Sequence, residues 1–260
     1  MTSSVRSCFN LPDEFDAYDS PYEILTSDYL SEHAKERVRY MLDYFESLSK
    51  TGCYLDAYYT APQLKALSCV FSILMCAEES ASLTFYRQAK QELDNDVRHA
   101  FCEIAAEEYV HDQLLKFLFT ALPITAESKH AARRARGTFL RMISPNPGEH
   151  FARIAALDST AVVILTAIIK SPVNLHVEPI QKLARFIRKD EGKHIRTALK
   201  YSRKLKTPSS VIDDAFGTAR SLLIDTLRPD EMIYRELGLS TDDLIQNTGS
   251  DDLSNIYASG

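Results

Sequence analysis

The chain of 260 residues contains no tryptophan and few residues that interrupt helices, with 8 glycines and 10 prolines. Its five cysteines form no C-x-x-C pair, which argues against a zinc knuckle or a disulfide framework. The longest nearly unbroken apolar run, 161–169, is about half as long as a membrane span. The N-terminus has no apolar stretch of the signal-peptide type. We therefore expect a soluble, cytoplasmic protein without a membrane partner.

Acidic residues outnumber basic ones by 36 to 30, so the net charge is −6. A general attraction to nucleic acid is therefore not expected. One local cluster of arginines is the exception. We interpret it as a solvated helix face or, alternatively, as a surface for an anionic substrate or partner: Arg133, Arg134, Arg136 and Arg141.

Apolar residues recur three or four positions apart over long stretches, which predicts an all-α fold. We expect an irregular N-terminal arm at 1–26, a single helical domain at 27–247 and a disordered tail at 248–260. Ser27 is the expected N-cap of the first helix, 27–49. The further helices are predicted to start at about Pro62 and to span about 94–121, 126–143, 149–170, 178–205, 208–227 and 229–238.

Four of these helices carry ionisable residues on the apolar stripe that should face the core, where an isolated charge is costly to bury. A spacing of i, i+3 places a carboxylate and an imidazole on one face of a helix, one turn apart. Single carboxylates on two helices and Glu-x-x-His on two others form the inventory of a dinuclear iron or manganese carboxylate site. The residues are Glu78, Glu108-x-x-His111, Asp158 and Glu191-x-x-His194.

A third match, Glu127-x-x-His130, lies in a polar and basic segment, and we interpret it as a chance occurrence. The other two lie on core stripes, and a further acid precedes each of them. The intervals from 78 to 108 and from 158 to 191 are similar, which is typical of two helix pairs that repeat one hairpin. As an alternative, these residues form buried salt bridges or hydrogen-bonded core positions without a metal.

The order of these motifs resembles the ferritin-like di-iron superfamily, in its dioxygen-activating branch with two histidines. This branch includes arylamine N-oxygenases, bacterial multicomponent monooxygenases, the small subunit of ribonucleotide reductase and acyl-carrier-protein desaturases. DEGKH at 190–194, EEYVH at 107–111 and AEES at 77–80 are similar to motifs of several of these enzymes. The resemblance covers about 62–205 and implies a ferritin-like four-helix bundle core with extra flanking helices.

The resemblance implies that the metal ligands are Glu78, Glu108, His111, Asp158, Glu191 and His194. Glu108 would bridge the ions together with Asp158 or Glu191. Glu79 is an alternative to Glu78, which fits the stripe better. Asp190 and Glu107 are implied to hydrogen-bond to the ligand histidines and to set their tautomers.

Three features distinguish the subfamilies. Ile187 stands where arylamine N-oxygenases typically add a third histidine, and Leu115 stands where the reductase subunit usually has a radical tyrosine. The acidic charge balance argues against a tRNA-hydroxylating enzyme. The tyrosines near the motifs are interpreted as packing residues: Tyr86, Tyr109 and Tyr201.

The resemblance implies an O2-dependent oxygenase or oxidase with two iron ions, or a manganese and an iron ion, acting on a small organic substrate by N-oxygenation or hydroxylation. No flavin or nicotinamide fingerprint is present, so an external electron donor, a reductase or ferredoxin, is implied. Alternatives are a desaturase-like oxidase with a carrier-protein-bound acyl substrate, a ferritin-like protein that handles iron or peroxide, and a metal-free interaction module. A homodimer is compatible by analogy with similar bundles.

Overall fold

The computed structural model describes residues 21–52 and 55–247, and over these ranges the predicted all-α fold is confirmed. Residues 1–20 of the predicted arm and the predicted tail at 248–260 lie outside the described residues. The end of the arm, Pro21–Thr26, forms a 3-10 helix. The α-helices are α1 (Glu32–Thr51), α2 (Ala61–Gln91), α3 (Asn95–Phe119), α4 (Ala126–Met142), α5 (Pro147–Lys170), α6 (Glu178–Lys204), α7 (Ser209–Leu227), α8 (Glu231–Tyr234) and α9 (Thr241–Asn247).

Local capping residues set the starts of the long helices. Asp94 accepts hydrogen bonds from two backbone N–H groups in the first turn of α3, and Asn146 accepts one in α5. The predicted start of the first helix was wrong, because Ser31 and not Ser27 caps α1. The Ser27 hydroxyl instead accepts a hydrogen bond from the backbone of Tyr29, which holds the chain in a turn before the helix.

The C-terminal region differs from the prediction in two ways. The predicted helix at 229–238 is divided into α8 and two 3-10 turns, Arg228–Asp230 and Arg235–Leu237. Gly238 ends this segment with a φ of 67°, a left-handed conformation that favours glycine. Helix α9 was not predicted, because its polar sequence shows no extended apolar stripe, and buried Leu244 holds it against the body.

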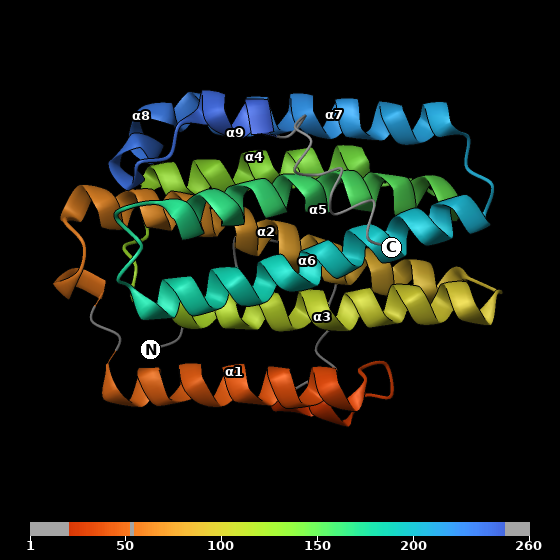
Figure 1. The fold of residues 1–260 in the computed structure, drawn as a ribbon, viewed down its shortest axis with the longest axis horizontal. Helices are drawn as coiled ribbons and strands as arrows, with labels where there is room; N and C mark the ends of the chain where they lie inside the picture. Colours follow the sequence, from red (N-terminus) through yellow and green to blue (C-terminus); the bar gives the residue numbers. More distant parts are fainter. Residues whose placement is uncertain (1–20, 53–54, 248–260) are drawn as a thin grey trace.

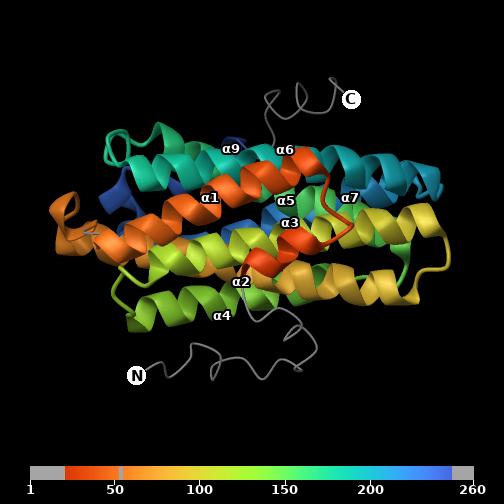
Figure 2. The same ribbon diagram turned by 90° about the horizontal axis from the view of Figure 1, so that it is seen from below.

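The long helices run roughly along one axis of an elongated molecule (Figure 1). Helix α2 packs against α3, α5 packs against α6, and α3 also contacts α6. Helices α4 and α7 cover the other side of this arrangement, with α4 packed on α2 and α7 on α5. Helix α1 lies across α3 and α6 on the opposite face (Figure 2).

Two apolar clusters fill the interior of the four central helices. One cluster contains the first half of α2 and the last half of α3, together with the adjoining parts of α5 and α6. The other contains the opposite ends of the same helices and includes Phe85, Phe101 and Phe151. The ionisable residues singled out by the sequence lie between these clusters, in one layer across the middle of the helices.

Two of the central helices are apolar enough to pass a test of length and hydropathy for membrane spans. These are α2 and α5, but 78% and 67% of their apolar stretches are buried inside the protein. Core helices of soluble proteins have the same properties. The burial of both helices is consistent with a soluble protein.

We predict opposite effects for two glycine-to-alanine substitutions. A Cβ atom at Gly148 of α5 would collide with Thr207 Oγ1 and lie 3.1 Å from Leu205 Cβ, in the turn between α6 and α7. Gly148→Ala should therefore destabilise the fold by about 1–3 kcal/mol. Gly137→Ala in α4 meets nothing within 4 Å and should stabilise it by about 0.5–1 kcal/mol. Denaturant unfolding of both variants tests this, and effects of the same sign would contradict it.

Candidate metal centre

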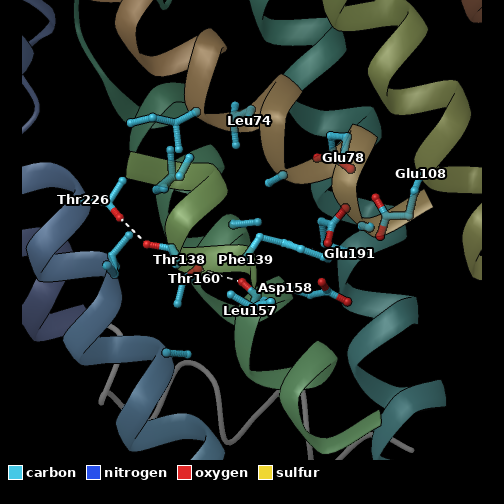
Figure 3. Close-up of a pocket in the computed structure, with 18 residues that line it drawn as sticks. Leu74, Glu78, Glu108, Thr138, Phe139, Leu157, Asp158, Thr160, Glu191 and Thr226 are labelled. Atoms are coloured by element: carbon cyan, nitrogen blue, oxygen red, sulfur yellow. Dashed lines mark hydrogen bonds between the residues drawn. The ribbon is translucent and has the colours of Figure 1, made fainter. Parts of the chain in front are cut away.

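The six predicted residues come together in the buried layer between the apolar clusters. Their carboxylates gather at one end of a cavity, where Glu78, Glu108, Asp158 and Glu191 point toward one another (Figure 3). Each of the six side chains belongs to a residue that is at most 7% exposed. They form two groups that could each hold a metal ion, because one ligand atom of every member lies within 4.8 Å of the others: Glu78, Glu108, His111 and Glu191, and Glu108, Asp158, Glu191 and His194.

Two carboxylates, Glu108 and Glu191, belong to both groups. Sharing of this kind is the arrangement expected of two neighbouring ions bridged by carboxylates. Of the two partners that the resemblance left open for Glu108, Asp158 belongs to one group alone, so the geometry favours Glu191. Glu79 is half-buried and belongs to neither group, which favours Glu78 as the residue from α2.

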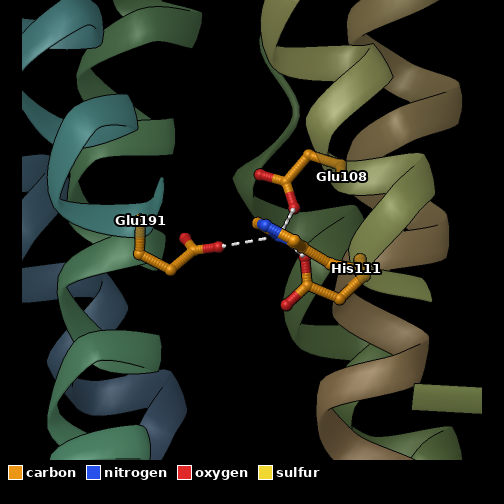
Figure 4. A group of neighbouring side chains, drawn as sticks. Glu108, His111 and Glu191 are labelled. Atoms are coloured by element: carbon orange, nitrogen blue, oxygen red, sulfur yellow. Dashed lines mark hydrogen bonds and ion pairs between the residues drawn. The ribbon is translucent and has the colours of Figure 1, made fainter. Parts of the chain in front are cut away.

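Both imidazole rings direct Nδ1 at the carboxylates. His111 Nδ1 lies 3.3 Å from Glu191 Oε1 and 3.5 Å from Glu108 Oε2, so it stands between α3 and α6 (Figure 4). His194 Nδ1 lies 3.1 Å from Glu108 Oε1. The centroids of the two rings are 5.9 Å apart, and both rings contact Glu108 and Glu191.

The opposite ring nitrogens contact acids across the interface of α3 and α6. His111 Nε2 lies 3.3 Å from Asp190 Oδ2, and His194 Nε2 lies 2.8 Å from Glu107 Oε2. Asp190 directly precedes Glu191 in α6 and contacts the histidine of α3. Glu107 directly precedes Glu108 in α3 and contacts the histidine of α6, so the two contacts are reciprocal. An Nε2–H that donates to these carboxylates leaves the Nδ1 lone pair directed into the centre, where a cation would bind.

Two cations stand behind these acids. The Arg37 guanidinium of α1 donates to Asp190 at 2.8 Å, and Lys193 lies 2.8 Å from Glu107. Burial raises the pKa of Asp190, but the hydrogen bond with His111 and the Arg37 charge outweigh it and hold the pKa at about 2. Burial also opposes ionisation of Glu107, yet its contacts with His194 and Lys193 lower its pKa.

The sequence analysis missed both cations. Lys193 lies inside the DEGKH motif, directly before His194. Its positive charge next to the histidine could therefore have been noticed from the sequence. Arg37 lies more than a hundred residues from Asp190, in a helix outside the central four. No local pattern marks Arg37, because its role depends on the docking of α1.

Crowding of like charges shifts the ionisation of the centre. Burial and the charges of Glu108 and Glu191 raise the pKa of Glu78 and of Asp158 well above the usual range. The carboxylates outweigh burial at both histidines and raise the pKa of each imidazole. Asp158 Oδ2 is buried without a hydrogen-bond partner among the described residues, and His194 Nδ1 faces the Glu108 carboxylate at 3.1 Å. Divalent cations would contact these atoms and offset the repulsion, so the residues fit a metal centre.

Two other sequence features lie away from the centre. His130 of the third Glu-x-x-His is exposed, Glu127 pairs with Lys65 at 2.6 Å, and neither belongs to the two groups. The arginine cluster is not a uniformly solvated face. Arg134 turns inward, donates to Thr226 O at 3.1 Å and pairs with Asp230 between α4 and the α7–α8 turn, which corrects the prediction for this residue.

A layer of aromatic rings closes one side of the centre. Each ring lies about two helical turns from one cluster residue of its own helix. The pairs are Phe85 and Glu78, Phe101 and Glu108, Phe151 and Asp158, and Tyr201 and His194. Phe101 and Phe151 stack at 4.1 Å between ring centroids, and Phe151 and Tyr201 stack at 5.4 Å. Tyr201 therefore packs as predicted, in an apolar layer beside the buried carboxylates.

Comparisons with protein-family models, with curated proteins and with solved structures find no match to this chain. The class that the fold and the site define is an all-helical protein with a buried acidic and histidine cluster that could hold metal ions. Any narrower assignment depends on the residues of the centre and on their geometry.

We predict that Arg37→Leu destabilises the fold by about 2 kcal/mol, because it leaves the buried Asp190 carboxylate without its cation. Lys35→Leu is the matched control on the same helix, since Lys35 pairs, among the described residues, with the exposed Glu32, and its loss should change stability little. Denaturant unfolding of both variants gives the comparison. Equal effects would show that the Arg37 pair contributes no more than a surface pair.

A second prediction concerns acid stability. His150 is 2% exposed beside Phe85 and Phe101, and burial lowers its pKa from 6.5 to about 4. The unfolded chain therefore binds a proton that the folded chain excludes, so stability falls as the pH drops from 6.5 toward 4, by roughly 3 kcal/mol in total. His150→Gln should lose less unfolding free energy over this range than the wild type. Parallel pH profiles for the two proteins would contradict the assignment.

Proposed function

We propose that the chain is a ferritin-like protein of the dioxygen-activating branch whose centre binds two iron ions, or one manganese and one iron ion. The observation that carries this proposal is the sharing of Glu108 and Glu191 between two groups, each completed by one histidine and one further carboxylate. Paired Glu-x-x-His motifs on facing helices are the ligand pattern of such centres. A buried salt-bridge cluster without a metal would leave Asp158 Oδ2 without a partner among the described residues.

When bound, the iron ions supply the redox chemistry with dioxygen that side chains lack. The four carboxylates of the two groups match the charge of two ferrous ions, so the loaded centre is close to neutral inside an apolar protein. Asp190 and Glu107 hold the Nε2 protons and keep each imidazole in one orientation. The aromatic layer keeps water from this end of the centre.

The pKa of each histidine is raised when no cation balances the carboxylates, so binding of an ion at Nδ1 displaces a proton from the imidazole. The affinity for ferrous iron should therefore fall as the pH is lowered. Arg37 and Lys193 keep Asp190 and Glu107 ionised, and these acids remain able to accept the Nε2 protons.

The proposed activity is O2-dependent oxidation of a small organic substrate, by N-oxygenation or hydroxylation, with electrons from a reductase or ferredoxin. A desaturase-like reaction on a carrier-bound acyl chain is the alternative. That alternative needs a basic surface for the acidic carrier, and the inward turn of Arg134 removes one of the four arginines that such a surface would use.

Metal content is the first test. The wild-type chain should retain about two irons after anaerobic ferrous loading and desalting. The double substitution Glu191→Ala with His194→Ala removes a shared carboxylate and one histidine, and this variant should lose the iron. Consumption of O2 with a chemical reductant should be lost together with the metal.

The third Glu-x-x-His provides the control. Glu127→Ala with His130→Ala changes the same two residue types at the surface of α4, and this variant should retain the iron of the wild type. A wild-type protein that keeps its helical circular dichroism but binds no iron would refute the proposal. Equal losses of iron in the two double variants would also refute it.

A further inference from the structure

The cavity beside the centre extends away from the carboxylates and has a volume of about 70 Å³. Its walls come from α2, α4, α5 and α7, with Glu108 of α3 and Glu191 of α6 at the inner end (Figure 3). This is the side of the molecule where α4 and α7 cover the central helices. The opposite side, beneath α1, is filled by the histidines and their acids.

Alanines create this space. One or two of them stand on each of the four wall helices, where a larger apolar side chain would fill the cavity: Ala77, Ala81, Ala135, Ala161 and Ala219. The remaining wall residues beyond the carboxylates are mainly leucine, isoleucine, phenylalanine and threonine. Five wall residues are half-buried and therefore nearest to solvent: Ala77, Thr138, Leu157, Thr160 and Ala161.

The threonine hydroxyls in the wall already have partners. Thr160 donates to Leu157 O at 2.7 Å, Thr226 donates to Leu222 O at 2.8 Å, and Thr138 shares a 2.8 Å contact with Thr226. Since the Thr226 proton is used by Leu222, the Thr138 proton lies between the two hydroxyls. The described wall therefore offers acceptor oxygens but no spare hydroxyl donor.

Charged side chains are also distributed unevenly around the cavity. No lysine, arginine or histidine stands in the described wall of the cavity, while four carboxylates stand at its inner end. One buried oxygen there, Asp158 Oδ2, has no hydrogen-bond partner among the described residues. A ligand with a carboxylate or phosphate inside this cavity would lose its hydration, and beyond the carboxylate end the described walls offer it no cation and no spare hydroxyl donor, which is unfavourable.

We propose that this cavity binds a small, uncharged, apolar compound, an aromatic ring or a short aliphatic chain, and holds it against the Asp158 side of the centre. The volume admits roughly five to seven water-sized atoms, which suits one ring better than a long acyl chain. The inference rests on the proposed function, because it assigns the substrate class of the same centre. Binding itself needs no turnover and is measurable separately.

Fluorobenzene and 4-fluorobenzoate are matched probes, since both carry one ring and one fluorine and only the second carries a charge. Their binding is followed by fluorine NMR, with the full chain both as purified and after loading with Zn²⁺, which keeps the charge of a ferrous centre without redox chemistry. We expect saturable binding of fluorobenzene. Binding of 4-fluorobenzoate should be weaker by about tenfold or more.

Two substitutions fill the cavity from opposite walls, and one control does not. Ala161→Leu in α5 and Ala77→Leu in α2 should each weaken fluorobenzene binding by about tenfold or more. Ala167→Leu is the matched control, because Ala167 is also half-buried in α5 but does not line the cavity, and it should bind like the wild type. Circular dichroism and thermal unfolding verify that each variant is folded.

Several outcomes would overturn the inference. These are no fluorobenzene binding by the wild type, equal or tighter binding of 4-fluorobenzoate, or equal effects of the substitutions at Ala161 and Ala167. Iron retention and O2 consumption without fluorobenzene binding would refute the substrate class and leave the proposed function standing. Fluorobenzene binding by a chain that retains no iron would refute the proposed function and leave the cavity as a binding site.

Discussion

Burial of four carboxylates and two imidazoles in one layer is the constraint on which the rest of this structure depends. Removing each charged group from water costs several kcal/mol unless opposite charges and hydrogen bonds compensate it. The chain supplies part of that compensation, through Asp190 and Glu107 behind the histidines and through Arg37 and Lys193 behind those acids. Charges of alternating sign thus extend from the centre outward, and the remaining imbalance lies at the innermost carboxylates, which could hold cations.

The two sides of this layer differ in construction. On the side of α3 and α6, helix α1 covers the histidines and their acids, and the Arg37 side chain packs over the Phe186 ring while it contacts Asp190. On the side of α2 and α5, alanines leave a cavity beneath α4 and α7. One side therefore holds the cluster residues in place with hydrogen bonds and ion pairs, and the other leaves room next to them. This division would suit the proposed function, in which the centre keeps its own geometry while a second molecule approaches.

Most of the helices could be predicted, because each depends on signals within its own segment. Apolar periodicity placed α2 to α7 within a few residues, and Asp94 and Asn146 act as local caps. The errors arose where local signals compete or are weak. Ser27 and Ser31 are both suitable caps, and the local sequence does not decide between them. Arg134 looks like a surface residue in α4, and its inward turn depends on Asp230, which lies about a hundred residues later.

The sequence by itself determined which residues face the interior of the central helices, because periodicity and the i, i+3 spacing assign side chains to one face of a helix. It therefore identified the six cluster residues and the acids beside the histidines. Only the tertiary structure decided that Glu108 and Glu191 are shared between two groups, that Arg37 reaches Asp190, and that a cavity adjoins Asp158. These features depend on distances between helices, and packing and not local spacing sets such distances.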